Sequence, residues 1–92
     1  MLNAALAPPL VKGIQSNNVS ACVKHFIFNS QEYDRQGGQG LTSYSASVGE
    51  RAAFELYVPP YAAAVAAGVG SVMCSFNRAW SAARTGPPPA PP

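Results

Sequence analysis

The chain has 92 residues, with six Lys or Arg against four Asp or Glu and a net charge of +2. The cations are scattered rather than gathered into a stripe, so we expect no nucleic-acid partner. Cys22 and Cys74 lack the spacing of metal ligands, which argues against zinc and leaves a disulfide open only if the fold joins them. Otherwise we expect two buried free thiols, because cysteine is among the most often buried residue types.

The first segment, residues 2–16, is expected to form a helix. Leu6, Leu10 and Ile14 recur every four residues and so mark one helical face. Pro8 and Pro9 must lie near the first turn or break the helix, and the two asparagines after residue 16 should end it. The segment is a poor signal peptide, because it has no positively charged start and no long unbroken apolar stretch.

Residues 19–28 are an almost continuous apolar run with β-branched members. This pattern predicts a strand buried on both faces of a parallel sheet. The following Gly- and Ser-rich connection, residues 29–48, is longer than usual, and such long connections tend to be functional or mobile.

Residues 49–67 are expected to form a helix interrupted by two prolines at positions 59 and 60. Glu50 would lie near the positive end of the helix dipole, and Arg51 could reach Glu55 four residues later. Gly68 is a suitable terminator before a second strand at residues 71–76. The order helix, strand, loop, helix, strand predicts an α/β fold with one βαβ unit.

Two further stretches bear on partners. Residues 56–77 carry no charge and are long enough to span a membrane, but two prolines and two glycines interrupt them, so we expect no membrane association. Residues 79–92 end in PPPAPP, which predicts an extended, disordered tail. We therefore divide the chain into residues 1–78 and a tail at residues 79–92.

Three sequence segments point to a family: ACVKHFIF at residues 21–28, RAAFELYVPP at 51–60 and AGVGSVMCSFN at 67–77. In this order they resemble glycoside hydrolase family 3 of the β-glucosidase type, over residues 10–78. The resemblance implies a fragment of the family's N-terminal (β/α)8-like barrel, a TIM-type fold that needs about 250 residues to close. We expect marginal stability for such a piece. After residue 78 the sequence lacks the family's Asn-Gly turn.

The resemblance implies that Lys24 and His25 bind the glucosyl ring beside the scissile bond. Lysine offers three donors and histidine a donor or an acceptor, which suits several sugar hydroxyls. From spacing alone, Lys24 would be an ordinary lysine at a strand end and His25 an ordinary core histidine. The family match favours sugar binding by both residues instead. Because successive side chains of a regular strand point to opposite faces, joint binding predicts an irregular backbone here, through a bulge or an unusual peptide.

Met73 and Phe76 match family positions that line the same subsite. Phe76 stands where the family commonly has a tyrosine whose hydroxyl bonds the nucleophile, so it keeps the ring and loses that hydroxyl. For Met73, ordinary core filling is an almost equal alternative.

Retaining glycoside hydrolysis needs two carboxyl groups about 5 to 5.5 Å apart. The chain offers Glu32 and Asp34 on the long connection and Glu50 and Glu55 on an outer helix. None stands in the family's nucleophile or acid/base context, so we expect no catalytic residue and no activity of this chain alone. The resemblance implies a β-glucoside or oligosaccharide substrate for the full-length enzyme and no cofactor.

A non-enzymatic interaction peptide is the alternative, because residues 88–91 fit the PxxP pattern that proline-reading domains bind. Asn18-Val19-Ser20 fits the N-glycosylation pattern but needs a secretory route. Relatives in the family are often secreted, whereas we expect no targeting signal in this chain. Its localisation is therefore left open.

Overall fold

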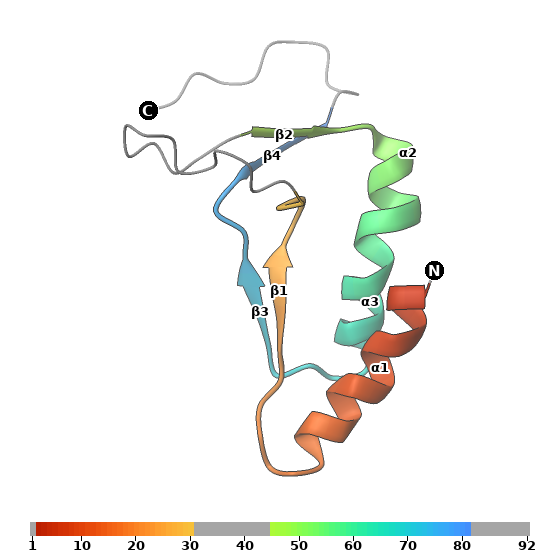
Figure 1. Ribbon diagram of the computed structural model, residues 1–92, viewed down its shortest axis with the longest axis vertical. Helices are drawn as coiled ribbons and strands as arrows, with labels where there is room; N and C mark the ends of the chain where they lie inside the picture. The colour runs from red at the N-terminus through yellow and green to blue at the C-terminus, as the bar shows by residue number, and fades with distance from the viewer. Residues whose placement is uncertain (1, 31–44, 82–92) are drawn as a thin grey trace.

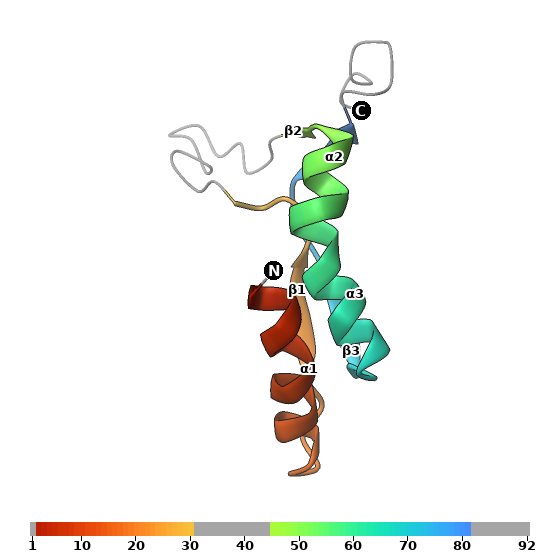
Figure 2. The same cartoon turned by 90° about the vertical axis from the view of Figure 1, so that its right-hand side faces the viewer.

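A computed structural model describes residues 2–30 and 45–81 of the chain. The elements are α1 (Leu2–Gln15), β1 (Cys22–Phe26), β2 (Ser45–Val48), α2 (Glu50–Ala52), the π-helical η1 (Ala53–Tyr57), α3 (Val58–Ala66), β3 (Ser71–Cys74) and β4 (Arg78–Ser81). In Figure 1 α2, η1 and α3 follow one another as a single helical rod. Figures 1 and 2 together show the rod and α1 on one side of β1 and β3. The predicted α/β class is confirmed.

The strands β1 and β3 pair in parallel, with Cys22 opposite Ser71 and Val23 opposite Val72. The helical rod connects them in the chain, so the predicted βαβ unit is present. It forms because an apolar, β-branched run on each side of the rod can pair only in parallel across a helical crossover.

A second parallel pair, β2 with β4, was not expected from the sequence. Its register places Ser45 opposite Arg78 and Val48 opposite Ser81. The segment expected to be a loop therefore ends in a strand, and β4 crosses the boundary placed after residue 78. Residues 31–44 and 82–92 lie outside the described residues, so the remaining loop and the Pro-rich tail stay predictions.

Helix α1 corrects two expectations. Pro8 and Pro9 lie inside an unbroken helix rather than near its first turn. The carbonyls that lose their bonds belong to residues four positions earlier, which are exposed or half-buried and can bond to water. The predicted apolar face is exposed as well, with Leu6 at 54% and Leu10 at 64%. The adjacent side of the helix, with Val11 buried and Ala7 partly buried, packs instead.

The core is small and lies between α1, α3 and the start of β1. Its buried residues are Val11, Ala21 and Ala64, and four partly buried residues pack against them: Ala7, Val23, Ala67 and Val69. Alanines at these positions let α1 and α3 approach each other closely. Complete burial of a side chain such as Val11 contributes about 1.5 to 3 kcal/mol, so this core is modest.

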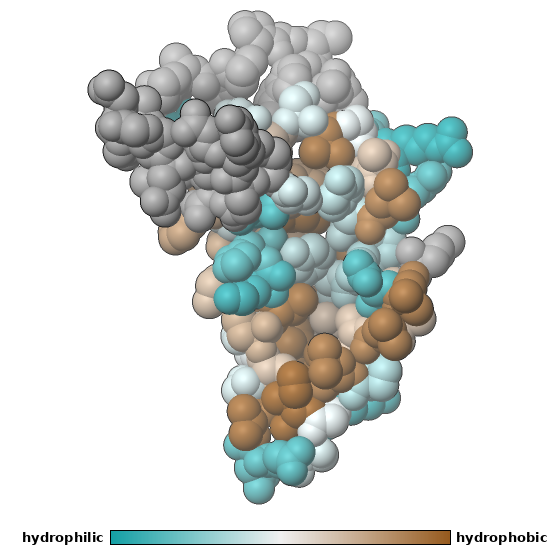
Figure 3. All heavy atoms as spheres, viewed as in Figure 1, coloured by the Kyte–Doolittle hydropathy of each residue, from teal (hydrophilic) through white to brown (hydrophobic). Residues whose placement is uncertain are grey.

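Much apolar surface stays uncovered. Figure 3 shows a hydrophobic band that follows α1 across the lower half of the view. The strand predicted to be buried on both faces alternates between exposed and half-buried residues, and β3 is exposed throughout. A single helical layer covers only one face of the pair, which is the reason for both differences. Cys22 and Cys74 are likewise exposed free thiols rather than buried ones.

Gln15 ties the last turn of α1 to the starts of both paired strands. Its Oε1 accepts hydrogen bonds from the backbone N–H groups of Gly70 at 2.8 Å and Ala21 at 3.4 Å. Its Nε2 donates to the Gly68 carbonyl at 2.9 Å. Gly68 has a φ of 81°, a left-handed conformation that ends α3 and favours glycine. These bonds align the starts of β1 and β3 beside each other.

The uncharged stretch at residues 56–77 is divided between the helical rod and β3. Within residues 2–30 and 45–81 no helix is long and apolar enough to cross a membrane.

Candidate functional site

The candidate residues gather where the parallel strands end. Lys24 and His25 belong to the second half of β1, and Met73 lies on the neighbouring strand β3. Lys24 is exposed, His25 is half-buried and the Met73 side chain is 47% exposed. Phe76 follows the end of β3 and is 81% exposed. The structure thus brings the first three residues to adjacent strands, with the phenylalanine just beyond.

The backbone of β1 is irregular at the two candidate sugar-binding residues. Val23 pairs with Val72 and Phe26 pairs with Cys74, with a register shift between them. Lys24 and His25 therefore lie opposite the single residue Met73, which is the arrangement of a bulge. The Lys24–His25 and Phe26–Ile27 peptide bonds are also cis. The register shift confirms the irregular backbone that joint binding required.

Tyr61 of α3 holds the bulge from the helical side. Its hydroxyl donates a hydrogen bond of 2.9 Å to the His25 carbonyl. Its ring meets the Phe26 ring edge-on, with centroids 5.0 Å apart and planes at 83°. Burial raises the pKa of Tyr61 above its ordinary value, because the protein disfavours the charged phenolate. The hydroxyl therefore stays a donor at neutral pH.

A second brace crosses between the segments that follow β1 and β3. The Ser75 N–H donates to the Phe26 carbonyl at 2.6 Å, and Asn77 Nδ2 donates to the Ile27 carbonyl at 2.9 Å. The Ser75 hydroxyl donates in turn to Asn77 Oδ1. These bonds fix the chain immediately after Lys24 and His25, which limits where those two side chains can point.

Sequence reasoning missed both braces. The available signal for Asn77 was a polar side chain directly after an apolar strand, where it can reach the neighbouring strand's end. The signal for Tyr61 was a single aromatic residue in an alanine-rich helix. Neither signal names the carbonyl that the side chain would bind.

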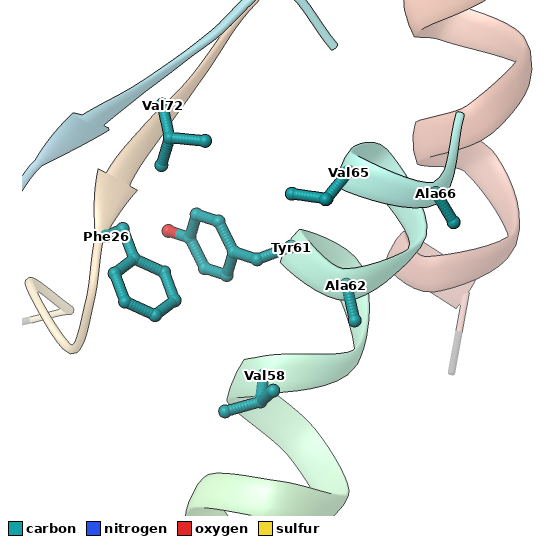
Figure 4. A pocket seen from close by; sticks show the side chains of 7 residues that line it. All are labelled: Phe26, Val58, Tyr61, Ala62, Val65, Ala66 and Val72. Carbon is teal, nitrogen blue, oxygen red and sulfur yellow. The ribbon is translucent and has the colours of Figure 1, made fainter. Parts of the chain in front are cut away.

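An apolar groove lies behind the bulge, between α3 and the strands. It has a volume of about 570 Å³ and is lined by Phe26, Val58, Tyr61, Ala62, Val65, Ala66 and Val72. In Figure 4 the rings of Phe26 and Tyr61 lie next to each other, with Val65 and Val72 on one side and Val58 on the other. The only polar side-chain group in this lining is the Tyr61 hydroxyl, which donates to the His25 carbonyl. None of the four candidate residues lines the groove.

A smaller hollow of about 290 Å³ lies near the start of the helical rod, lined by Phe26, Ile27, Phe28, Val48, Glu50, Ala53, Phe54, Val58 and Ala79. It contains one carboxylate and none of the candidate residues. The described part of the chain therefore presents its candidate site as an open strand edge rather than as a closed cavity.

The two described carboxylates, Glu50 and Glu55, lie on the helical rod as the sequence predicted. Glu55 accepts a 2.9 Å bond from Arg51 Nε, and the two side chains are 59% and 88% exposed. This pair is the helix-surface contact that the spacing predicts. Glu32 and Asp34 lie outside the described residues. Among residues 2–30 and 45–81 no three potential ligands gather in a group that could hold a metal ion.

Comparisons with known proteins agree with this architecture. The sequence model of the glycosyl hydrolase family 3 N-terminal domain matches residues 1–89. The chain is 46% identical over 87 residues to "Beta-glucosidase 2" of Saccharomycopsis fibuligera, covering 84% of this chain and 10% of that protein. It is 47% identical over 68 residues to "Probable beta-glucosidase L" of Aspergillus fumigatus, covering 74% of this chain and 8% of that protein.

A solved structure is also similar. The glycoside hydrolase family 3 β-glucosidase of Neurospora crassa superposes with a TM-score of 0.72 at 36% sequence identity, covering 83% of this chain and 10% of that one. The chain thus spans about a tenth of the length of the relatives it matches.

Proposed function

The chain belongs to glycosyl hydrolase family 3, and from that premise we propose that it carries part of the glucosyl-binding subsite of a β-glucosidase-type enzyme. The observation that supports this most is the bulge in β1, where Lys24 and His25 lie opposite Met73. A regular strand would send the two side chains to opposite faces. The bulge removes that obstacle to binding one sugar together.

The chemistry of the two side chains fits a sugar ring. The Lys24 ammonium offers three donors, and the His25 imidazole offers a donor and, when neutral, an acceptor. Lys24 is exposed, whereas His25 is half-buried and its backbone carbonyl is held by the Tyr61 hydroxyl. Met73 would supply an apolar contact beside them. Phe76 would line the same subsite with its ring and without a hydroxyl.

We propose further that the chain is part of the family's N-terminal (β/α)8-like barrel. Support comes from the parallel pairing of β1 with β3 across a helical rod. It comes also from apolar surface that no described residue covers, including Leu6 and Leu10 on α1. A closed barrel has about 250 residues, so neighbouring strands and helices would have to cover this surface.

In this account the nucleophile and the acid/base of a retaining reaction come from elsewhere in the enzyme. Retention needs two carboxyl groups about 5 to 5.5 Å apart. On the helical rod, Glu55 pairs with Arg51, and Glu50 stands in the first turn, where it lines the smaller hollow without a second carboxylate. The 92-residue chain is therefore inactive alone, and its substrate in the full-length enzyme is a β-glucoside or oligosaccharide.

A chimera tests the proposal. Residues 10–78 replace the matched segment of "Beta-glucosidase 2" of S. fibuligera, and hydrolysis of an aryl β-glucoside is measured. The chimera is expected to be active. Lys24→Ala should lower kcat/KM by about 10- to 100-fold, since hydrogen bonds to charged groups contribute about 1.5 to 3 kcal/mol. His25→Ala should lower it in the same direction.

Lys12→Ala is the matched control, because Lys12 is an exposed lysine in the last turn of α1, at the other end of the unit. It should leave kcat/KM unchanged. A Lys24→Ala chimera as active as this control would contradict the sugar-binding role. Hydrolysis by the 92-residue chain itself, purified from a host that lacks β-glucosidase, would contradict the expected inactivity.

A further inference from the structure

The turn between α1 and β1 lies at the opposite end of the βαβ unit from the candidate site. Figure 1 shows this turn at the bottom of the view, whereas β1 points upward to its carboxyl end. Asn18 occupies the turn with a φ of 57°, and its N–H donates to the Gln15 carbonyl at 3.2 Å. The chain then continues through Val19 and Ser20 into β1.

This turn contains an acceptor pattern for N-linked oligosaccharide. The 92-residue sequence has five asparagines, and only Asn18 is followed two positions later by Ser or Thr. The middle residue is Val19, which satisfies the requirement that it is not proline. The hydroxyl required at the third position is that of Ser20.

We propose that Asn18 is an N-glycosylation site when the chain enters a secretory lumen. The donor is a polyprenyl diphosphate-linked oligosaccharide. The Asn18 Nδ2 atom forms a bond to the anomeric carbon C1 of the first sugar. The bond between C1 and the diphosphate oxygen breaks, and its electron pair leaves with the polyprenyl diphosphate. One amide proton passes to a base, so an amide N–H is exchanged for an N-glycosidic bond.

The structure supports this acceptor by exposure and by freedom of the side chain. Asn18 and Ser20 are exposed, and Val19 is 55% exposed. The neighbouring Asn17 uses its amide to bond the Gly13 carbonyl at 2.9 Å. Within residues 2–30 and 45–81 the Asn18 side chain makes no hydrogen bond. An attached glycan would therefore displace no contact of the described fold.

The location separates the glycan from the sugar-binding edge. Lys24 and His25 follow in the second half of β1, so the length of the strand lies between them and the turn. A glycan at Asn18 would extend from the amino-terminal end of the parallel strands. It would leave the carboxyl edge free.

A purely structural role for Asn18 is the competing explanation. Asparagine tolerates the left-handed conformation that ends many helices, which alone accounts for its presence here. Ser20 also has a structural neighbour, since its Oγ lies beside Gly70, where an added Cβ would collide with it. These roles require no modification. If Asn18 and Ser20 had only these structural roles, removal of the Ser20 hydroxyl would not change the mass of Asn18.

The experiment uses the 92-residue chain behind a cleavable secretion leader, translated with microsomes. A reference Asn-X-Thr acceptor lies between the leader and Met1, and only molecules with that acceptor occupied are scored. The tryptic peptide of residues 13–24 is then treated with peptide N-glycosidase in heavy-oxygen water. Deglycosylation converts a modified asparagine into a heavy-labelled aspartate, and fragmentation distinguishes Asn17 from Asn18.

We expect the label at Asn18 in the wild-type chain, retained in Ser20→Thr and in Asn17→Gln and lost in Ser20→Ala. The Ser20→Ala variant keeps Asn18 and needs no folded chain, because the acceptor is read during translocation. An unlabelled Asn18 in molecules whose reference acceptor is occupied would overturn the proposal. Label that persists in Ser20→Ala would overturn it as well.

Discussion

The contacts of Gln15 support a quantitative prediction about stability. Replacement by leucine removes all three hydrogen bonds that join α1 to the starts of β1 and β3. Each typically contributes about 0.5 to 1.5 kcal/mol. The two bonds to the Gly68 and Gly70 backbone are exposed, so water can replace part of them. We therefore expect Gln15→Leu to lower the free energy of unfolding by about 1.5 to 3 kcal/mol.

The assay is urea unfolding of the 92-residue chain, followed by far-ultraviolet circular dichroism. Gln15→Glu is an intermediate variant, because a carboxylate still accepts from the Ala21 and Gly70 N–H groups but cannot donate to the Gly68 carbonyl. It should cost about 0.5 to 1.5 kcal/mol. Lys12→Leu is the control, since it places the same leucine at an exposed position of the same helix and should change stability by less than about 0.5 kcal/mol.

The comparison between Gln15→Leu and Lys12→Leu tests whether the three Gln15 hydrogen bonds stabilise the alignment of the strands. If Gln15→Leu unfolds at the same urea concentration as Lys12→Leu, the three bonds do not hold the strands. The alignment of the starts of β1 and β3 would then arise from the pairing of the two strands alone.

Three further results are expected. Tyr61→Phe should lower the free energy of unfolding by about 1 kcal/mol at neutral pH. Because the raised pKa of Tyr61 favours the neutral phenol in the fold, the stability of the wild-type chain should also fall as pH rises above about 10. The same alkaline loss in Tyr61→Phe would refute this pH dependence. Gly68→Ala should destabilise by about 1 kcal/mol in thermal unfolding, since its φ of 81° disfavours a Cβ; no change would contradict the strain. A double-mutant cycle on the exposed Arg51–Glu55 pair should give a coupling of at most about 0.5 kcal/mol, and a coupling several times larger would show that the pair does more than the surface contact described.

The sequence predicted those parts of the fold that depend on local pattern. Two apolar runs on either side of a helical stretch were sufficient to predict parallel pairing of β1 with β3. The glycine at position 68 was identified as a helix end, and its φ of 81° confirms this. The irregular backbone at Lys24 and His25 was predicted from the family resemblance, which implies that both side chains bind one sugar, because adjacent side chains of a regular strand point to opposite faces.

Other features depend on contacts that no local pattern reveals. The strands β2 and β4 have the sequences SASV and RAWS, which are short and weakly apolar, and they pair across a long separation in the chain. The spacing of Leu6 and Leu10 correctly defined a helical face but could not tell that Val11 and Ala7 pack while that face stays open. The Gln15 bonds to Gly68 and Gly70 and the Asn77 brace join segments about fifty residues apart, so only the folded chain shows them.

The central claim is that Lys24 and His25 bind the glucosyl ring. The measurement that tests it most directly is the inhibition constant of glucose against the chimera, because glucose occupies the subsite without reacting. The account predicts a constant about tenfold or more higher in Lys24→Ala, with the Lys12→Ala control unchanged. An unchanged glucose constant in Lys24→Ala and in His25→Ala would show that the bulge does not bind the sugar.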